Sequence, residues 1–443
     1  MSISWLSESA TNLGTLISSG KIDPIELTEL YLDEIEKHSL RNRIYSTVTA
    51  DRARAEAKAA SGRMKSGMRR SHLDGVPISW KDLFDTTDIL TEAGTELLKG
   101  RIPKTDATVL RNATEAGLIC LGKTHMSELA FSGLGLNPIT QSPPSINNLS
   151  AVAGGSSSGA AASVAFNLAV CGIGSDTGGS VRVPSAWNDL VGLKTTSDRL
   201  SLNGVVPLCA RFDTIGPLCR SVEDASFALA ALEGDKPVNL TNANLEGCRF
   251  AVCKTAAFDD IRELPKKAFD NSIKRLQAMG AVVEYINIPT VTEALGLTGI
   301  LFPTEAYGTW KHEIESNPEA MFEEILLRFR SGSNVLASDY VAAWQALDQL
   351  RAEYSEATAG YDAILMPSSP ILPPNIDRLA QDHDYYVTEN LLALRNTRIG
   401  NLMGACALTL PTGVPSCGFM ILCPPMGEHR LLRLGAAVEN AMA

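Results

Sequence analysis

Short apolar runs alternate with stretches of helical periodicity along most of the chain, and this alternation limits the choice of fold more than any other feature. A helix is expected to begin at Asp23, a capping residue, with Pro24 at its first position. Strands that alternate with helices favour a mostly parallel or mixed sheet. The expected fold class is therefore α/β, with a large mixed β-sheet core covered by helices on both faces. The periodicity predicts strands at 75–80, 118–122, 249–253, 281–288 and 361–367, a strand or bend at 171–174, and helices at 51–66, 106–117, 156–170, 221–232, 265–279 and 428–442.

The sequence shows no clear linker between domains. Its 443 residues alone suggest two or three domains, but no Pro/Ser-rich segment or charge run separates them. Large α/β enzymes often reach this length as one body, so we expect a single domain over residues 1–443. Between 290 and 360 the pattern is helical, amphipathic and rich in aromatic residues. This stretch predicts a helical cap over the sheet.

The charge balance and the apolar pattern exclude two classes of partner. Lys and Arg total 39 against 50 Asp and Glu, which gives a formal net charge of −11. Without a basic field to gather phosphates, nucleic acid is not an expected ligand. No stretch of 18 or more apolar residues occurs, and the first residues do not resemble a signal peptide. We therefore expect a cytoplasmic protein without membrane association.

Nothing in the sequence indicates a metal ion or an organic cofactor. The nine cysteines are scattered without a C-x-x-C pair, and the six histidines are isolated. The cysteines are expected to be reduced and mostly buried. The glycine-rich stretch 172–178 fits neither dinucleotide-binding nor P-loop spacing. We expect no metal and no cofactor.

Two separate glycine-flanked serines carry the strongest chemical signal. The segment 154–159 reads GGSSSG, and Ser180 in the segment 178–180 (GGS) follows Ser156 by 24 residues (180 minus 156). Glycine beside a serine permits unusual backbone torsions and close approach of a substrate. Such places suit a nucleophile next to bare backbone N–H groups.

The second of these segments also suits an oxyanion hole. Thr177, Gly178, Gly179 and Ser180 supply four consecutive N–H groups that a turn can aim at one point. Removing one donor of this kind typically costs about 3–4 kcal/mol of transition-state stabilisation. The alternative interpretation is a Gly/Ser-rich turn without a catalytic role.

Lys81 is the candidate base for a serine nucleophile. It ends the predicted buried strand that begins at Gly75, and none of the six histidines belongs to a triad motif. A lysine at a strand end more often reaches solvent. When it is buried instead, desolvation lowers its pKa and makes the neutral amine available as a base.

Together these three segments resemble the amidase signature family. The shared patterns are G-V-P-x-x-x-K-D at 75–82, GGSS(G/S)G at 154–159 and G-(T/S)-D-(T/I)-G-G-S-(I/V)-R at 174–182, with the same separation between the two serines. Further family landmarks, among them Asn401, extend the resemblance over roughly residues 5–440.

The resemblance implies the fold and a catalytic triad. Lys81 corresponds to the general base, Ser156 to a bridging serine in a cis peptide, and Ser180 to the nucleophile. The implied activity is hydrolysis of a small-molecule carboxamide to a carboxylic acid and ammonia or an amine, through a seryl acyl-enzyme. A homodimer is the oligomeric state that family habit suggests.

The resemblance also implies residues around the triad. The segment 123–130 corresponds to a family segment that lines the substrate channel, which places Ala130 and Ser132 near the site. The residues expected to support the triad from behind are Ser175, Asp176 and Arg182.

Two positions depart from the family pattern. Residues 146–153 are polar and turn-like where the family commonly has a segment containing Trp, Arg or Pro. Val183 replaces the Gln that is usual in subunits of glutamine-dependent aminoacyl-tRNA amidotransferases. The second departure weakens that particular assignment.

Three alternatives remain open. Residues 155–159 formally fit the G-x-S-x-G motif of Ser–His–Asp hydrolases with Ser157 as nucleophile, although 146–153 does not read as the strand that this motif needs. An amidotransferase A-type subunit, which releases ammonia from glutamine for a partner protein, shares the same triad. A non-catalytic binding protein is disfavoured because all three triad residues are present. For a free-standing enzyme, aryl, aliphatic, ureide and indole-type amides all fit.

Overall fold

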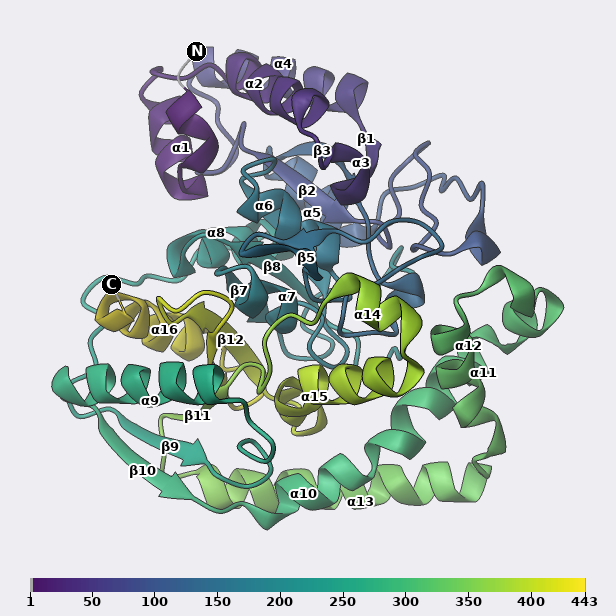
Figure 1. Ribbon diagram of the computed structural model, residues 1–443. Helices are drawn as coiled ribbons and strands as arrows, with labels where there is room; N and C mark the ends of the chain where they lie inside the picture. Colours follow the sequence, from purple (N-terminus) through teal and green to yellow (C-terminus); the bar gives the residue numbers. More distant parts are fainter. Residues whose placement is uncertain (1–2, 443) are drawn as a thin grey trace.

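One eleven-stranded sheet forms the core of the structure (Figure 1). The structure is a computed structural model that describes residues 3–442. The predicted α/β class with a large mixed sheet is confirmed. In spatial order the strands are β1 (Tyr45–Val48), β3 (Ile119–Thr124), β2 (Pro77–Lys81), β6 (Cys171–Ser175), β8 (Ile215–Cys219), β7 (Val191–Lys194), β12 (Cys406–Pro411), β13 (Gly418–Cys423), β11 (Ala363–Pro367), β9 (Arg249–Cys253) and β10 (Val282–Ile286).

Two parallel sections of the sheet are joined by antiparallel strands. β2 pairs in parallel with β3 on one side and with β6 on the other. Near the opposite edge, β9 pairs in parallel with β10 and β11. The strand pairs between β6 and β11 are all antiparallel. Because β2, β3 and β6 are buried at every position, both faces of this section need a covering layer.

The α-helices account for most of the remaining ordered chain. They are α1 (Ala10–Ser18), α2 (Pro24–Lys37), α3 (Arg41–Ile44), α4 (Ala50–Lys65), α5 (Thr108–Glu115), α6 (Ser158–Ala165), α7 (Arg182–Trp187), α8 (Val222–Glu233), α9 (Glu263–Ala278), α10 (Pro289–Gly296), α11 (Thr298–Ser316), α12 (Glu323–Arg330), α13 (Ala337–Thr358), α14 (Ile376–Gln381), α15 (His383–Leu402) and α16 (Glu428–Met442). Short 3-10 helices lie at Ile3–Ser7, Glu96–Leu98, Glu128–Ala130, Pro318–Ala320 and Ser331–Asn334, and β4 (Pro144–Ser145) pairs with β5 (Asn148–Val152) in a separate hairpin.

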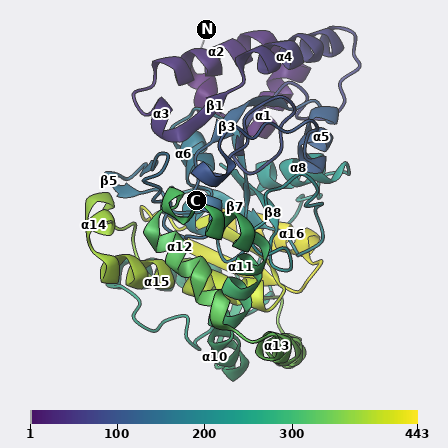
Figure 2. The same ribbon diagram turned by 90° about the vertical axis from the view of Figure 1, so that its right-hand side faces the viewer.

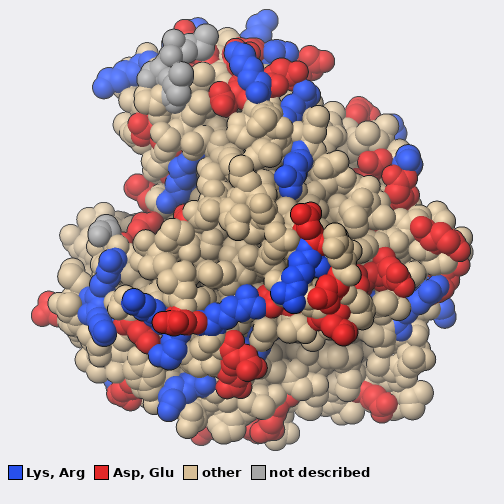
Figure 3. Space-filling view, viewed as in Figure 1, with Lys and Arg blue, Asp and Glu red and all other residues tan. Residues whose placement is uncertain are grey.

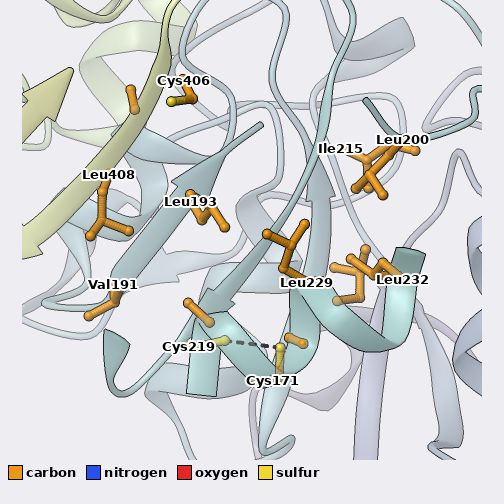
Figure 4. Packing of buried hydrophobic residues seen from close by; sticks show 14 of the residues in the cluster. Cys171, Val191, Leu193, Leu200, Ile215, Cys219, Leu229, Leu232, Cys406 and Leu408 are labelled. Atoms are coloured by element: carbon orange, nitrogen blue, oxygen red, sulfur yellow. Dashed lines mark hydrogen bonds between the residues drawn. The ribbon is translucent and has the colours of Figure 1, made fainter. Parts of the chain in front are cut away.

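Helices cover both faces of the sheet, and β7 shows how. A Cβ on Gly192 would lie 2.3 Å from Ser185 Oγ of α7, so this position faces α7. Its neighbours Val191 and Leu193 belong to the same buried hydrophobic cluster as Leu229 of α8 (Figure 4). Since successive strand residues alternate between faces, α7 and α8 lie on opposite sides of the sheet.

Buried apolar side chains fill the layer between the sheet and α8. Leu229 and Leu232 of α8 face Ile215 of β8, and the thiols of Cys171 and Cys219 meet below them at 3.2 Å (Figure 4). Eight of the nine cysteines are buried and all nine are free. This agrees with the expected reduced, mostly buried thiols.

The predicted elements are largely confirmed, and their ends follow local capping. Asp23 caps α2 by accepting a hydrogen bond from the Ile25 N–H, with Pro24 at the first turn. Ser221 caps α8 in the same way. Asp106 does not cap α5, because its carboxylate is paired with Arg52. The helix predicted over 106–117 therefore begins at Thr108 without a capping side chain.

Two other expectations need correction. The helix expected over 156–170 covers only Ser158–Ala165, and the chain then turns into β6. The segment 146–153 is not merely a turn, since it contains β5. Its polar sequence is explained by exposure, because Asn148, Leu149 and Ser150 face solvent in the small hairpin.

The stretch between 290 and 360 is helical, as expected, and forms α10 to α13. In the view of Figure 2, α11 and α12 lie in front of the strands while α10 and α13 lie at one end of the molecule. Phe302 of α11 and Trp344 of α13 both stack on Phe212, which ties these helices to the rest of the chain.

The surface view shows acidic and basic side chains intermixed rather than gathered into one basic patch on the visible face (Figure 3). Within residues 3–442, no helix is both long enough and apolar enough to cross a membrane.

Candidate active site

The ends of two neighbouring parallel strands bring the first site residues together. β2 ends at Lys81 and β6 ends at Ser175, and both side chains are buried. Because parallel neighbours present their carboxyl ends at the same edge of a sheet, the two side chains meet. Lys81 Nζ donates a 2.8 Å hydrogen bond to Ser175 Oγ.

Lys81 also contacts the bridging-serine candidate. Its Nζ donates a 2.7 Å hydrogen bond to Ser156 Oγ. Burial lowers the pKa of Lys81 to about 7, although the negative charges of Asp213 and Asp176 act in the opposite direction. Near neutral pH a large share of this amine is therefore uncharged and able to accept a proton.

A comparison of the fully buried lysines in the described chain separates Lys81 from the others. Lys123 Nζ lies 3.3 Å from the carboxylate of Asp82 and forms a buried ion pair. Lys194 Nζ donates to two backbone carbonyls, those of Thr195 and Ala405. Lys81 alone has two serine hydroxyls as its partners. Its surroundings suit proton exchange rather than a fixed ion pair.

The segment that carries Ser156 is held close to the sheet by small residues. The Gly155–Ser156 peptide bond is cis, and α6 begins two residues later and packs against β6 and β2. A Cβ on Gly172 of β6 would lie 2.6 Å from the Ala160 carbonyl oxygen of α6. Only glycine permits this approach, which places Ser156 within hydrogen-bond reach of Lys81.

A buried ion pair anchors the loop that follows β6. The Asp176 carboxylate accepts hydrogen bonds from Arg182 Nε at 3.0 Å and Nη2 at 2.9 Å. Asn401 of α15 binds both partners. Burial acts to raise the pKa of Asp176, but the adjacent Arg182 guanidinium outweighs it and holds the pKa well below its usual range. The Arg182–Asp176 ion pair therefore fixes the conformation of the loop.

The loop leaves four consecutive backbone donors free. The N–H groups of Thr177, Gly178, Gly179 and Ser180 have no hydrogen-bond acceptor among residues 3–442. Gly179 has φ 138°, and a Cβ there would lie 2.1 Å from Thr397 Oγ1, so glycine is required. Unpaired donors beside a serine are the arrangement that stabilises a developing oxyanion.

Ser180 lies between these donors and an open cavity. Its side chain lines the cavity, and within the described chain its hydroxyl has no hydrogen-bond partner. The structure thus forms the Lys81–Ser156 link but no hydrogen bond between Ser156 Oγ and Ser180 Oγ. Catalytic hydrogen bonds are often long or unformed before substrate binds, so the missing second link does not exclude a relay through Ser156.

The cavity of about 300 Å³ is walled by three helices and the segment near residue 130. Ala130 and Ser132 both line it, as do residues of α11, α12 and α15. Ser132 is held by Tyr386 and Asn390 of α15 through side-chain hydrogen bonds. Of the residues that the resemblance implies at the site, Ala130, Ser132, Thr177, Gly178 and Ser180 line this cavity.

Ser157 does not have the surroundings of a nucleophile. Its side chain is fully buried, and its hydroxyl donates to the backbone carbonyl of Ser175 at 3.2 Å. The strand before it, β5, does exist, so the absence of a strand is not a valid objection to a Ser–His–Asp site. The valid objection is that the Ser157 hydroxyl is buried and bonded to backbone atoms. In addition, no histidine side chain is hydrogen-bonded to Ser157 within residues 3–442.

Sequence reasoning did not identify the individual cavity residues of α12 and α15. Arg328, Tyr386, Asn390 and Arg398 line the cavity, but none belongs to a recognisable motif. Asp213 accepts a hydrogen bond from the Thr177 hydroxyl and so fixes one end of the donor loop. Across the described residues no group of three or more His, Cys, Asp or Glu side chains could hold a metal ion.

Comparisons with known proteins agree with this geometry. A family model described as Amidase matches residues 26–432. The A-type subunit of glutamyl-tRNA(Gln) amidotransferase from Anaeromyxobacter dehalogenans is 30% identical, with 97% of this chain and 95% of that protein covered. A 2-amino-5-chloromuconic acid deaminase of Comamonas testosteroni is 31% identical, with 97% and 96% covered. A solved amidase structure matches with a TM-score of 0.88 and 28% identity, over 98% of this chain and 100% of that one.

The anchor of the donor loop can be tested by stability. Arg182→Met leaves the Asp176 carboxylate buried without its cation, so we expect the free energy of unfolding to fall by about 3–5 kcal/mol in urea denaturation. Adding Asp176→Asn to this variant removes the uncompensated charge and should recover part of the loss. Arg249→Met removes a half-exposed pair with Glu284 and should cost at most about 1 kcal/mol. A single Arg182 variant as stable as this control would show that the pair does not anchor the loop.

Proposed function

The chain belongs to the amidase family, and from this premise we propose that it is an amide hydrolase with Ser180 as nucleophile, Ser156 as proton relay and Lys81 as base. Its substrate is a small-molecule carboxamide, which it converts to a carboxylic acid and ammonia or an amine. The observation that carries this proposal is the double contact of the buried Lys81 amine with Ser156 and Ser175, next to a loop of free N–H donors. A lysine with hydroxyl partners and a pKa near neutrality is suited to deprotonate a serine.

Acylation begins with proton transfer along the two serines. Ser180 Oγ attacks the amide carbonyl carbon, its proton passes to Ser156 Oγ, and the Ser156 proton passes to Lys81 Nζ. The carbonyl oxygen becomes an oxyanion held by the N–H groups of residues 177–180. The C–N bond then breaks, and the leaving nitrogen receives the proton back from Lys81 through Ser156. The products of this half-reaction are an amine or ammonia and an ester on Ser180.

Deacylation uses the same proton relay a second time. Water attacks the ester carbonyl while its proton passes through Ser156 to Lys81. The tetrahedral intermediate collapses, the carboxylic acid leaves, and Ser180 Oγ regains a proton from the relay. Ser175 shares the Lys81 amine with Ser156, so it orients the amine while the proton moves through Ser156.

Replacement of the triad side chains tests these roles. Ser180→Ala should remove turnover of a primary amide and labelling by a serine-reactive fluorophosphonate. Lys81→Ala should lower kcat by at least about 100-fold at neutral pH because the base is lost. Ammonia release from one primary amide measures the turnover of both variants.

Ser157→Ala is the matched control for this series, because Ser157 adjoins Ser156 but bonds only to backbone atoms. It should retain most of the activity. Near-normal turnover by Ser180→Ala, or loss of labelling in Ser157→Ala alone, would instead assign the nucleophile to Ser157.

The pH dependence follows from the lowered pKa of Lys81. With the pKa at about 7, the amine is protonated and inactive below that pH and uncharged above it. For a neutral amide, kcat/KM should fall about tenfold per pH unit below pH 7 and level off above pH 8. A profile that is flat between about pH 5.5 and 8 would exclude Lys81 as the titrating base.

A second candidate function is supported by the relatives themselves. Proteins named as the A-type subunit of glutamyl-tRNA(Gln) amidotransferase are about 30% identical over nearly the whole chain, and such a protein would deliver ammonia to a partner. Val183 argues against this function, because those proteins are expected to carry Gln there. If the chain has this role, glutamine should be the preferred amide and its hydrolysis should depend on the partner. Efficient ammonia release from amides by the chain alone favours the free-standing hydrolase.

A further inference from the structure

A second cavity, of about 840 Å³, lies apart from the active site. It is lined by one side of α13 and by three further segments, 196–198, 403–405 and 422–425. Among the described residues, the two cavities share no lining residue. Phe212 lies between them, because its ring stacks on Phe302 at the first cavity and on Trp344 at the second. The second cavity is therefore a separate space, and it is large enough for an organic molecule.

Positive charge exceeds negative charge at this second cavity. The charged side chains that line it within residues 3–442 are Arg211, Arg351, Arg430 and Asp198. Arg430 is neutralised by Asp362, and Asp198 is exposed to solvent, which screens its charge. Arg211 forms no salt bridge within the described chain. Arg351 Nη1 lies 3.4 Å from Asp348, but this carboxylate is 64% exposed and such a pair contributes little.

The Trp344 ring lies beside both of these available cations. The Cζ atoms of Arg211 and Arg351 lie 3.7 and 5.7 Å from the centroid of that ring. Arg351 is held further by a 2.7 Å hydrogen bond from its Nε to the Leu402 carbonyl oxygen. Burial lowers the pKa of Arg351 and the Arg211 charge acts in the same direction, although Asp348 opposes them. The two guanidinium groups thus repel each other, and an anion bound to both would offset this repulsion.

Apolar side chains form another part of the wall. Ile364 of β11, Leu422 of β13 and Met403 all line the cavity, as does Pro424. A bare inorganic ion would leave these side chains in contact with water. A ligand with an apolar body would instead cover them, which is favourable in proportion to the apolar area removed from water.

We propose that the second cavity is a binding site for a small organic anion whose head is a carboxylate or a phosphate group and whose body is apolar. Arg211 and Arg351 donate hydrogen bonds to the oxygens of the head, since a guanidinium suits both kinds of oxyanion. The body of the ligand lies against Ile364, Leu422 and Met403. This inference does not depend on the proposed hydrolase reaction, because none of these residues takes part in it.

The first experiment compares four probes by calorimetry: phenyl phosphate, benzoate, inorganic phosphate and benzyl alcohol. At least one of the two organic anions should bind at least about 10-fold more tightly than benzyl alcohol, because the neutral probe lacks the charged hydrogen bonds. The tighter of the two identifies the head group. Phenyl phosphate should also bind more tightly than inorganic phosphate, which has no apolar body. No binding by either organic anion, or equal affinity for benzyl alcohol, would overturn the proposal.

The second experiment assigns the binding to the two arginines. Arg211→Met and Arg351→Met should each weaken binding of the better organic anion by about 10-fold or more. Arg211→Lys keeps the charge but not the planar set of donors, so it should retain only part of the affinity. An affinity that is unchanged in both Met variants would overturn the proposal.

Two other arginines provide matched controls. Arg378 of α14 also lies over an aromatic ring, with its Cζ 3.7 Å from the centroid of Tyr385, but it lines neither of the two cavities. Arg398 lines only the active-site cavity. Arg378→Met and Arg398→Met should both bind the probe as the original protein does. Loss of binding in Arg398→Met would place the anion at the active site and overturn the proposal.

Thermal unfolding gives an independent readout that also checks folding. Arg211 is exposed, so without a probe Arg211→Met should unfold close to the temperature of the original protein. The better organic anion should raise the midpoint of unfolding of the original protein and of Arg378→Met, because it binds the folded state, but not that of Arg211→Met. An equal increase in all three proteins would overturn the proposal. Neither experiment requires turnover, so failure of this site and failure of the proposed hydrolase reaction are observed separately.

Discussion

The proposed chemistry depends on an amine that is buried without an ion-pair partner among residues 3–442. Burial disfavours the charged form of Lys81, and only hydroxyl groups contact its nitrogen. Two carboxylates lie close enough to act on the amine through their charge, yet both are engaged elsewhere. Asp176 is bound by Arg182, and Asp213 accepts hydrogen bonds from Thr177 and two backbone N–H groups. If either carboxylate contacted Lys81 directly, the ion pair would hold the proton that the mechanism needs to move.

The same arrangement keeps the donor loop in place. The Asp176 side chain also accepts from the N–H groups of Val181 and Arg182, so the carboxylate satisfies the end of the loop while the preceding four N–H groups stay free. Asn401 and Thr397 of α15 fix the loop from the other side. With this ion pair in place, the N–H groups of Val181 and Arg182 are paired within the fold, while those of residues 177–180 stay free for a ligand.

The central parallel strands and the segments that carry the candidate triad could be predicted from the sequence because each has a local signature. Buried strands are continuous apolar runs, and Lys81, Ser156 and Ser180 lie in glycine-containing motifs that limit the backbone. Helix α15 has no such signature, because its buried side includes Glu389, Asn390, Asn396, Thr397, Arg398 and Asn401. Polar residues on the inward face reverse the pattern by which an amphipathic helix is recognised. The residues that line the cavity could therefore not be predicted from hydrophobic periodicity, although they determine which ligands fit.

Several polar groups without a partner among residues 3–442 gather at the active-site cavity. Ser180 Oγ, the N–H groups of residues 177–180 and the guanidinium groups of Arg398 and Arg328 adjoin the same cavity, whereas Arg182 is paired with Asp176. A fold optimised only for stability would pair or replace these groups. Their positions instead suit a ligand whose carbonyl oxygen lies at the free N–H donors. The features least favourable for folding are thus the ones that most closely define the ligand.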